Sequence, residues 1–340
     1  DCDVHQGNGT AVIFSGKDYA FTFSIHQMDL YPAQKPRSSL DVGLWTGDGD
    51  DKYLAALQEH IPRIYEEFQP DLVYYLAGAD PLDRDKLGGL RISQDGLLER
   101  DRVVIGNARR LGIPLVRRAE MLAELMRLKH GVAVAGSHGK TTTTSLVAAV
   151  LAAADLDPTV IVGGQVKTMG SNAVLGAGEH LVAEADESDG TFLHLTPSIA
   201  VVTNIDHEHV DFYPDMGALR EAFAAFLLRV PFYGACVLCA DDPEVRALMP
   251  RLDRKIITYG LSSGAEVRSD PGTIVPGDFG QEAVVWAFGQ EMGTQRLQLR
   301  GRHNLQNALA AVAVGLELGV PFVSIAAGLA ASLGVGRRCE

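Results

Sequence analysis

Short apolar runs alternate with helix-forming runs along most of this chain. Residues 132–135 (VAVA) are an apolar run of strand length, and residues 143–154 (TTSLVAAVLAAA) form a helix after a glycine-containing turn. Further strand-like runs lie at 181–183, 199–203 and 234–240. Strands alternating with helices are typical of α/β proteins with a mostly parallel sheet covered by helices. We expect this fold class for the larger, second part of the chain.

The first third of the chain predicts a second α/β unit. Residues 72–76 (LVYYL) have the pattern of a buried strand. Residues 107–116 predict the end of a helix, a turn and another buried strand, and residues 117–127 predict an amphipathic helix. We therefore expect two α/β units that meet near this helix.

The turn between residues 135 and 143 has the composition of a phosphate-binding loop. Its glycines allow backbone N–H groups to turn toward an anion, and the helix that follows adds the partial positive charge of its N-terminus. The match to G-x-x-x-x-G-K-[ST] is imperfect, because Val134 occupies the leading glycine position. Lys140 would reach the outer phosphates of a nucleotide, and the Thr141 hydroxyl would bind Mg²⁺. The residues of this predicted site are Gly136, Ser137, His138, Gly139, Lys140, Thr141 and Thr142.

Polar residues follow the next two predicted strands. Glu184 ends one strand and begins an acidic cluster with Asp186, Glu187 and Asp189. A carboxylate at a strand end near a phosphate loop is where a second Mg²⁺ ligand is needed, although most of these acids can also form a solvated turn. The next strand ends in residues 204–211 (NIDHEHVD), where two histidines and nearby acids could make a zinc site.

The first residues of the chain place carboxylates and an imidazole at alternate positions. Asp3 and His5 would point to one face of an extended segment, with Asp1 beside them. Asp80 follows the predicted strand at 72–76, at the end where open α/β sheets place their sites. Two carboxylates and one imidazole would leave the fourth position of a catalytic-type zinc site open; the alternative is a solvated loop.

Composition excludes several classes of function. The net charge of −13 argues against nonspecific binding of nucleic acid or an anionic membrane. No apolar run reaches the length of a membrane span, about 18 residues. Four cysteines are too few for a disulfide framework, and Cys236 and Cys239 lie within one apolar run, so we expect a reducing cytoplasm. Since the chain begins with Asp1, we expect it to be a fragment.

The segments at 1–11 (DCDVHQGNGTA), 40–57 and 70–101 resemble the middle of bacterial histone-deacetylase-family proteins. This resemblance implies part of an arginase/deacetylase-like parallel sheet over residues 1–116. It also implies that Asp3, His5 and Asp80 match zinc ligands, and that Asp1 and Ser24 match a monovalent-cation site. The paired catalytic histidines of that family precede the matched region, and a general base is needed to activate zinc-bound water. We therefore expect metal binding rather than deacetylation.

From residue 118 onward the chain is similar to the Mur ligase family, specifically to its alanine-adding branch. The resemblance is carried by the segments at 118–151, 181–216, 230–245 and 301–319. It implies a central ATP-binding domain over residues 117–332 and the start of a linker to a C-terminal ligase domain over residues 333–340. The shortened glycine loop is the form that this family uses.

The Mur ligase resemblance also implies roles for individual residues. Lys140, Glu184 and His209 would be catalytic, and Thr141, Glu184 and His209 would hold Mg²⁺. Asn204 would shape the nucleotide site, and at least one of Asn304 and Asn307 would contact adenine, although both could simply cap the following helix.

The implied reaction is an ATP-dependent ligation that joins UDP-N-acetylmuramate to L-alanine through an acyl phosphate in peptidoglycan precursor synthesis. We expect this activity to be incomplete in the chain. Two alternatives remain: a zinc-dependent hydrolase of the deacetylase family, and a catalytically silent protein that binds ATP or metal. Because each resemblance stops where the other begins, the chain is expected to join two genes near residue 116, by natural fusion or by sequence assembly.

Overall fold

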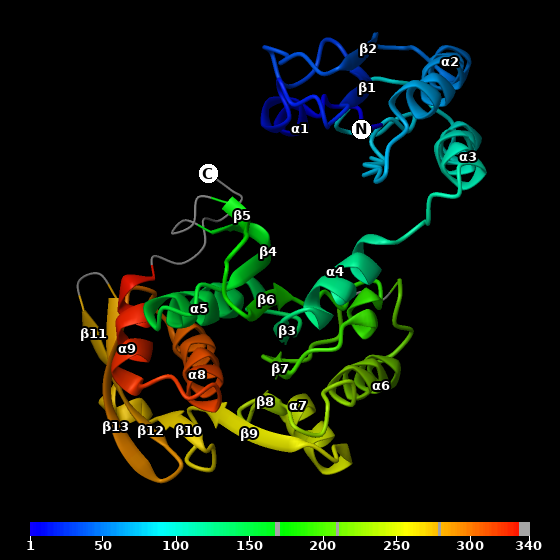
Figure 1. The fold of residues 1–340 in the computed structure, drawn as a ribbon. Coiled ribbons are helices and arrows are strands. Elements are labelled where there is room, and N and C mark those ends of the chain that lie inside the picture. The colour runs from blue at the N-terminus through cyan, green and yellow to red at the C-terminus, as the bar shows by residue number, and fades with distance from the viewer. Residues whose placement is uncertain (167–170, 209–210, 278–279, 333–340) are drawn as a thin grey trace. The chain divides into compact units, whose positions relative to one another are not determined.

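The structure is a computed structural model that describes residues 1–166, 171–208, 211–277 and 280–332. It contains two compact units, residues 1–116 and 117–340, which are treated separately below (Figure 1). None of the helices in the described ranges is long and apolar enough to cross a membrane.

The first unit is a small α/β assembly around one core. Its strands β1 and β2 are parallel, with Phe23 opposite Leu40 and Gln27 opposite Leu44. Helices α2 and α3 contribute Tyr53, Leu57 and Val104, among others, to the core. The elements are α1 Asn8–Ile13, β1 Phe23–Gln27, β2 Leu40–Leu44, α2 Asp50–Phe68 and α3 Gln94–Arg110.

The N-terminal residues lie beside β1 although they form no assigned strand. Ile25 N donates to Asp1 O over 3.1 Å, and Gln27 N donates to Val4 O over 2.9 Å. On the other side, Cys2 N donates to Leu76 O over 2.8 Å. The N-terminal segment thus connects β1 to the segment that carries Asp80.

Two predicted strands of this unit are wrong. Residues 72–76 form no strand, and Leu72, Tyr74 and Leu76 are each at least half exposed. The alternating apolar pattern buries only one side of this segment, because among the described residues no strand pairs with it and covers the other. Residues 113–116 also form no strand, and their apolar side chains at 115 and 116 are exposed.

The second unit is a large mixed sheet with helices on both faces, and the predicted fold class is confirmed for this unit. Its strand order is β11-β12-β10-β9-β8-β7-β3-β6-β4-β5, and β13 pairs with β12. Neighbouring strands from β4 through β6, β3, β7, β8 and β9 to β10 are parallel, and the two ends of the sheet are antiparallel.

The bounds of these elements follow the chain. The strands are β3 His130–Ala135, β4 Thr159–Val166, β5 Ser171–Val174, β6 His180–Glu184, β7 Ile199–Val202, β8 Ala235–Cys239, β9 Lys255–Gly260, β10 Val267–Ser269, β11 Val275–Gly277, β12 Gly280–Ala287 and β13 Gln290–Leu297. The α-helices are α4 Arg118–Arg127, α5 Lys140–Ala153, α6 Met216–Leu227, α7 Pro243–Leu248, α8 Arg302–Glu317 and α9 Phe322–Ala331. Short 3₁₀ turns lie at Thr191–His194, Met249–Arg251 and Pro271–Thr273.

The central strand β3 shows how the sequence pattern builds two hydrophobic layers. Val132 and Val134 pack with α5, α8 and α9, whereas Ala133 and Ala135 pack with α4, α6 and α7 on the other face (Figure 1). Alternate residues of a strand point to opposite faces, so a strand covered on both sides is apolar throughout. The end of β3 and the start of α5 are thereby fixed on either side of the glycine turn.

Candidate functional site

The glycine turn between β3 and α5 has a backbone that only glycine accommodates. Gly136 has φ +132° and Gly139 has φ +84°. A Cβ on Gly136 would lie 2.1 Å from Thr203 Oγ1, and a Cβ on Gly139 would lie 2.7 Å from Asn307 Oδ1. Both positions are therefore restricted by their conformation and by a close neighbour.

The residues after β7 hold this turn in place. His138 N donates to Asn204 Oδ1 over 2.8 Å, and Asn204 Nδ2 donates back to His138 O over 2.9 Å. The Thr203 hydroxyl donates to His138 O over 2.6 Å, and Ser137 N donates to Asn204 O over 3.1 Å. The turn is thus fixed before any ligand binds, which is the arrangement expected of an anion site at a helix N-terminus.

The loop lysine is held by a buried carboxylate. Lys140 Nζ lies 3.0 and 2.9 Å from the two carboxylate oxygens of Glu187, and it donates to Gly136 O over 2.6 Å. The Glu187 side chain is 1% exposed and that of Lys140 is 16% exposed. Sequence reasoning missed this partner, because a run of acids after a strand has the pattern of a solvated turn. Asp186 and Asp189 are indeed exposed.

The donor atoms near Thr141 suit a hard divalent cation. Glu184 ends β6, as predicted, and its Oε1 is buried without a hydrogen-bond partner among the described residues. Burial raises the pKa of Glu184, and hydrogen bonds with the Thr141 side chain and the Gly163 backbone lower it only in part. A buried carboxylate oxygen without a partner, beside a hydroxyl, fits Mg²⁺, which prefers oxygen ligands.

A pocket of about 320 Å³ opens beside the glycine turn. Asn307 and Gln306 line it from α8, and Asp241 lines it from the residues after β8. Burial would raise the pKa of Asp241, but hydrogen bonds from Leu261 N, the Gln306 amide and Ser262 N outweigh this and lower it. The complete lining is His138, Gly139, Thr203, Asn204, Cys239, Asp241, Asp242, Pro243, Tyr259, His303, Gln306 and Asn307.

The two candidate asparagines occupy different positions on α8. Asn307 is buried and lines the pocket, whereas Asn304 is half-buried outside the lining and donates to Arg300 O over 2.7 Å. The possibility that they cap the helix is wrong. Gly301 is the N-cap residue, so both side chains lie within the helix.

The remaining candidates on this edge lie around the turn. Ser137 and Thr142 are half-buried, and the exposed His138 ring has Nε2 3.4 Å from Asp206 Oδ2 and 3.5 Å from Glu208 Oε1. His209 lies outside the described residues, so its predicted Mg²⁺ contact stays a prediction.

The C-x-x-C pair is structural. Cys236 packs with the α6 face of the sheet, and Cys239 packs with the α8 face. Burial raises the pKa of Cys236 to about 12 and that of Cys239 to about 11, so both are inert thiols. Residues three apart on a strand point to opposite faces, which prevents a shared metal ion.

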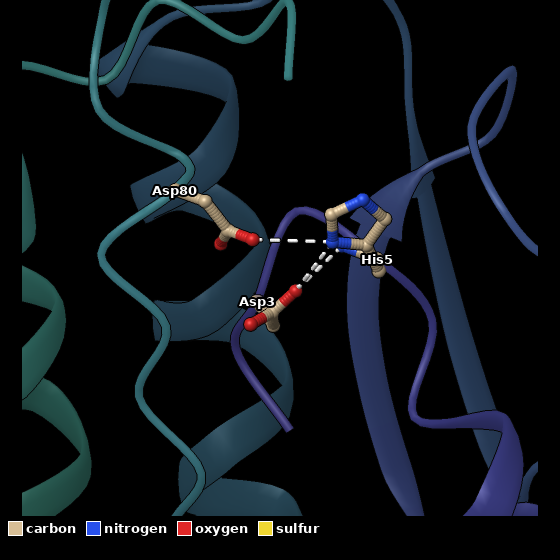
Figure 2. A group of neighbouring side chains, drawn as sticks. All are labelled: Asp3, His5 and Asp80. Carbon is tan, nitrogen blue, oxygen red and sulfur yellow. Dashed lines mark hydrogen bonds and ion pairs between the residues drawn. The ribbon is translucent and has the colours of Figure 1, made fainter. Parts of the chain in front are cut away.

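A second cluster lies in the first unit. His5 Nδ1 is 3.1 Å from Asp3 Oδ1 and 3.1 Å from Asp80 Oδ2, and Figure 2 shows the three side chains converging. One ligand atom from each residue lies within 4.8 Å of the others. Residues 3–5 form a bend rather than the expected extended strand, so a local turn brings Asp3 and His5 together.

Backbone contacts fix Asp80 in this cluster. Val4 N donates to Asp80 Oδ1 over 3.0 Å, while burial raises the pKa of Asp80. A Cβ on Gly78 would lie 2.3 Å from Asp3 Oδ2 and 2.7 Å from Asp80 Oδ1, so glycine is required there for the carboxylates to approach. Two carboxylates and one imidazole fit zinc.

The pair predicted for a monovalent cation lies in the same unit. Asp1 Oδ1 is buried and makes no hydrogen bond to any described residue. Ser24 is buried, and its hydroxyl lies 3.0 Å from His26 Nδ1 and accepts from Gly7 N over 3.3 Å. Of the two, only Asp1 has an oxygen left without a protein partner.

Comparison with known families identifies the larger unit. The family model of the Mur ligase middle domain matches residues 134–315, more than half of the chain. The chain belongs to the Mur ligase family. The family model of the histone deacetylase domain matches residues 1–120, which confirms the resemblance of the first unit.

Curated relatives place the chain near one branch of the Mur ligase family. UDP-N-acetylmuramate–L-alanine ligase of Desulfosudis oleivorans is 52% identical over 240 residues, covering 71% of this chain and 52% of the relative. The enzyme of the same name from Bordetella petrii is 56% identical over 238 residues, covering 68% and 50%. The chain thus spans about half the length of the curated relatives it matches.

Solved structures of Mur ligases have the same fold. UDP-N-acetylmuramate-alanine ligase MurC of Thermotoga maritima superimposes with a TM-score of 0.60 at 28% identity, covering 70% of this chain and 54% of that chain. A UDP-N-acetylmuramate:L-alanyl-gamma-D-glutamyl-meso-diaminopimelate ligase from Neisseria superimposes with a TM-score of 0.65 at 22% identity, covering 92% and 91%. The second likeness concerns the fold alone.

Proposed function

We propose that residues 117–332 bind MgATP and supply the ATP side of an amide-forming ligation between UDP-N-acetylmuramate and L-alanine. The observation that carries this proposal is the preformed turn between β3 and α5, with Lys140 at its end and the unpartnered Glu184 oxygen beside Thr141. The name and identity of the curated relatives support the choice of substrates.

Each residue has a role in this proposal. Backbone N–H groups at the start of α5 face the phosphates, and Lys140 neutralises charge on the outer ones. Thr141 and Glu184 hold Mg²⁺, together with His209 in the family pattern. The bound Mg²⁺ neutralises charge on the transferred phosphoryl group. Asn307 lines the pocket beside the turn and contacts adenine with its amide.

The reaction follows from these groups and the two substrates. The carboxylate oxygen of UDP-N-acetylmuramate attacks the γ-phosphorus of ATP, which releases ADP and forms an acyl phosphate. The amine of L-alanine then attacks the acyl carbon, forming an amide and releasing inorganic phosphate and a proton. This chain holds the ATP in line and neutralises its charge. We infer a cytoplasmic setting, where ATP is available.

Phosphate release tests the ligation directly. The complete chain is incubated with MgATP, UDP-N-acetylmuramate and L-alanine, and each substrate is omitted in turn. Release that requires both substrates supports the ligation. Binding of MgATP without such release would restrict the proposal to nucleotide binding, and absence of MgATP binding would overturn it altogether.

A second candidate function belongs to residues 1–116. We propose that Asp3, His5 and Asp80 bind zinc, and the carrying observation is the convergence of their three donor atoms. Hydrolysis of an acetyl-lysine substrate is the activity that the family model suggests, and acetate release measures it. Metal binding without acetate release would leave a metal-binding unit without catalysis.

A further inference from the structure

The phosphate-loop lysine has no ammonium proton to spare in this structure. An ammonium group has three donors. Lys140 Nζ lies within hydrogen-bond distance of three acceptors: Gly136 O at 2.6 Å, Glu187 Oε1 at 3.0 Å and Glu187 Oε2 at 2.9 Å. A phosphate oxygen can therefore bind Lys140 only by replacing one of these acceptors.

Glu187 is a strong competitor because its environment fixes it in place. The residue is 0% exposed. Its main-chain carbonyl accepts from the Tyr213 hydroxyl over 2.7 Å and from Gly190 N over 3.0 Å. Tyr213 is itself buried, so the loop after β6 is anchored on the α6 side of the sheet. A buried carboxylate that loses its cation is left uncompensated, which opposes any movement of Lys140 away from it.

We propose that Glu187 is a positioning residue that competes with the outer phosphates of ATP for Lys140. In the nucleotide-free protein it draws the ammonium toward the loop after β6. When MgATP binds, phosphate oxygens replace part of the Lys140–Glu187 pair, and the free energy of that exchange is subtracted from the affinity. This inference rests on the proposed MgATP site and adds a residue that sets its affinity.

A binding titration tests the competition. Glu187→Gln should tighten MgATP binding by about tenfold, within the usual range of a coupling between two linked equilibria. The same substitution in a Lys140→Met background should change the affinity less than about twofold, because no lysine remains to be shared. A merely structural Glu187 would give the opposite result: weaker or unchanged binding in Glu187→Gln overturns the competition.

Matched variants separate the pair from general charge effects. Asp189→Asn removes the same charge from the same loop, but Asp189 is exposed and bonds to Thr191 rather than to Lys140. It should leave the MgATP affinity within about twofold of the wild type. If Glu187→Gln does not fold, Glu187→Asp withdraws the carboxylate while keeping its charge and should also tighten binding; unchanged binding would count against the proposal.

A stability cycle tests the pair without nucleotide. The sequence has tryptophans at 45 and 286, so Trp45→Phe leaves Trp286 in β12 as the reporter of the second unit. In urea, Lys140→Met and Glu187→Gln should each destabilise this unit, and the double variant should lose clearly less than their sum. Additive effects would overturn the pairing. Absence of MgATP binding in the wild type, with coupling intact, would instead overturn the proposed function.

Discussion

Gly139 of the phosphate loop lies directly against Asn307 of α8, so that a Cβ at residue 139 would be 2.7 Å from Asn307 Oδ1. This contact joins the turn at the start of α5 to a helix more than 160 residues further along the chain. It also joins the two regions that the proposed ATP would contact, its phosphates and its adenine. The shape of the nucleotide site therefore depends on how α8 packs against α5.

Gly139→Ala is expected to destabilise the second unit and to abolish MgATP binding. The φ of +84° costs an alanine roughly 1–2 kcal/mol, and displacement of Asn307 adds to that. Gly319→Ala is the matched control, since Gly319 has φ +74° and open space around its missing Cβ. Urea unfolding followed through Trp286 should show a larger loss for Gly139→Ala; equal losses would show that the Asn307 contact is unimportant.

Glu184→Gln is expected to remove the Mg²⁺ dependence of ATP binding. The wild type should lose affinity when Mg²⁺ is removed with a chelator, because the cation joins Thr141, Glu184 and the phosphates. The variant should bind Mg²⁺ at least about tenfold more weakly, since even the loss of a group next to a ligand has that effect. Asp189→Asn should retain the wild-type response. A Glu184→Gln chain whose ATP affinity still rises with Mg²⁺ would exclude Glu184 as a ligand.

Alanine at Asp3 or His5 is expected to abolish zinc binding by the first unit. Each substitution removes one of only three protein donors, so the remaining two should hold the ion weakly. Elemental analysis after dialysis against limiting zinc measures the metal per chain. Asp71→Ala is the control, as Asp71 is an exposed carboxylate of the same unit. Equal zinc in all variants would place the ion elsewhere.

Asp241→Asn is expected to reduce stability at neutral pH more than at low pH. Asp241 has a pKa below its ordinary value, so its contribution is present above the unfolded pKa of about 3.9 and is lost as the pH falls through the lower folded value. Replacing a charged acceptor should cost about 1.5–3 kcal/mol at pH 7. Urea unfolding at pH 7 and at pH 3 measures the difference. Asp253→Asn, at an exposed site, should show almost none, and an equal loss for Asp241→Asn at both pH values would contradict the account.

The sequence predicted the central strand–turn–helix because all its signals are local. The apolar run before Gly136 and the helix-forming run after Gly139 are both where the pattern places them, although α5 begins at Lys140 rather than at Thr143. The predicted strands ending at Glu184 and near Asn204 are also confirmed. Each of these elements is specified by its own composition.

The wrong or missed features depend on residues far apart in the chain. The burial of Glu187 follows from Lys140 and Tyr213, and nothing in its own acidic segment indicates it. The run at 72–76 is apolar enough for a strand, but a strand forms only where neighbouring strands complete its hydrogen bonds. Local pattern states which residues prefer burial; it does not state which partners are present.

Calorimetric titration of the complete chain with MgATP is the most direct test of the central claim. The account predicts saturable binding of one nucleotide per chain and a loss of roughly a hundredfold in affinity for Lys140→Ala, as expected for a desolvated charged contact. Lys255→Ala, which removes an exposed lysine paired with Glu317, should bind like the wild type. A wild-type chain that does not bind MgATP, or a Lys140→Ala chain that binds it equally well, would contradict the account.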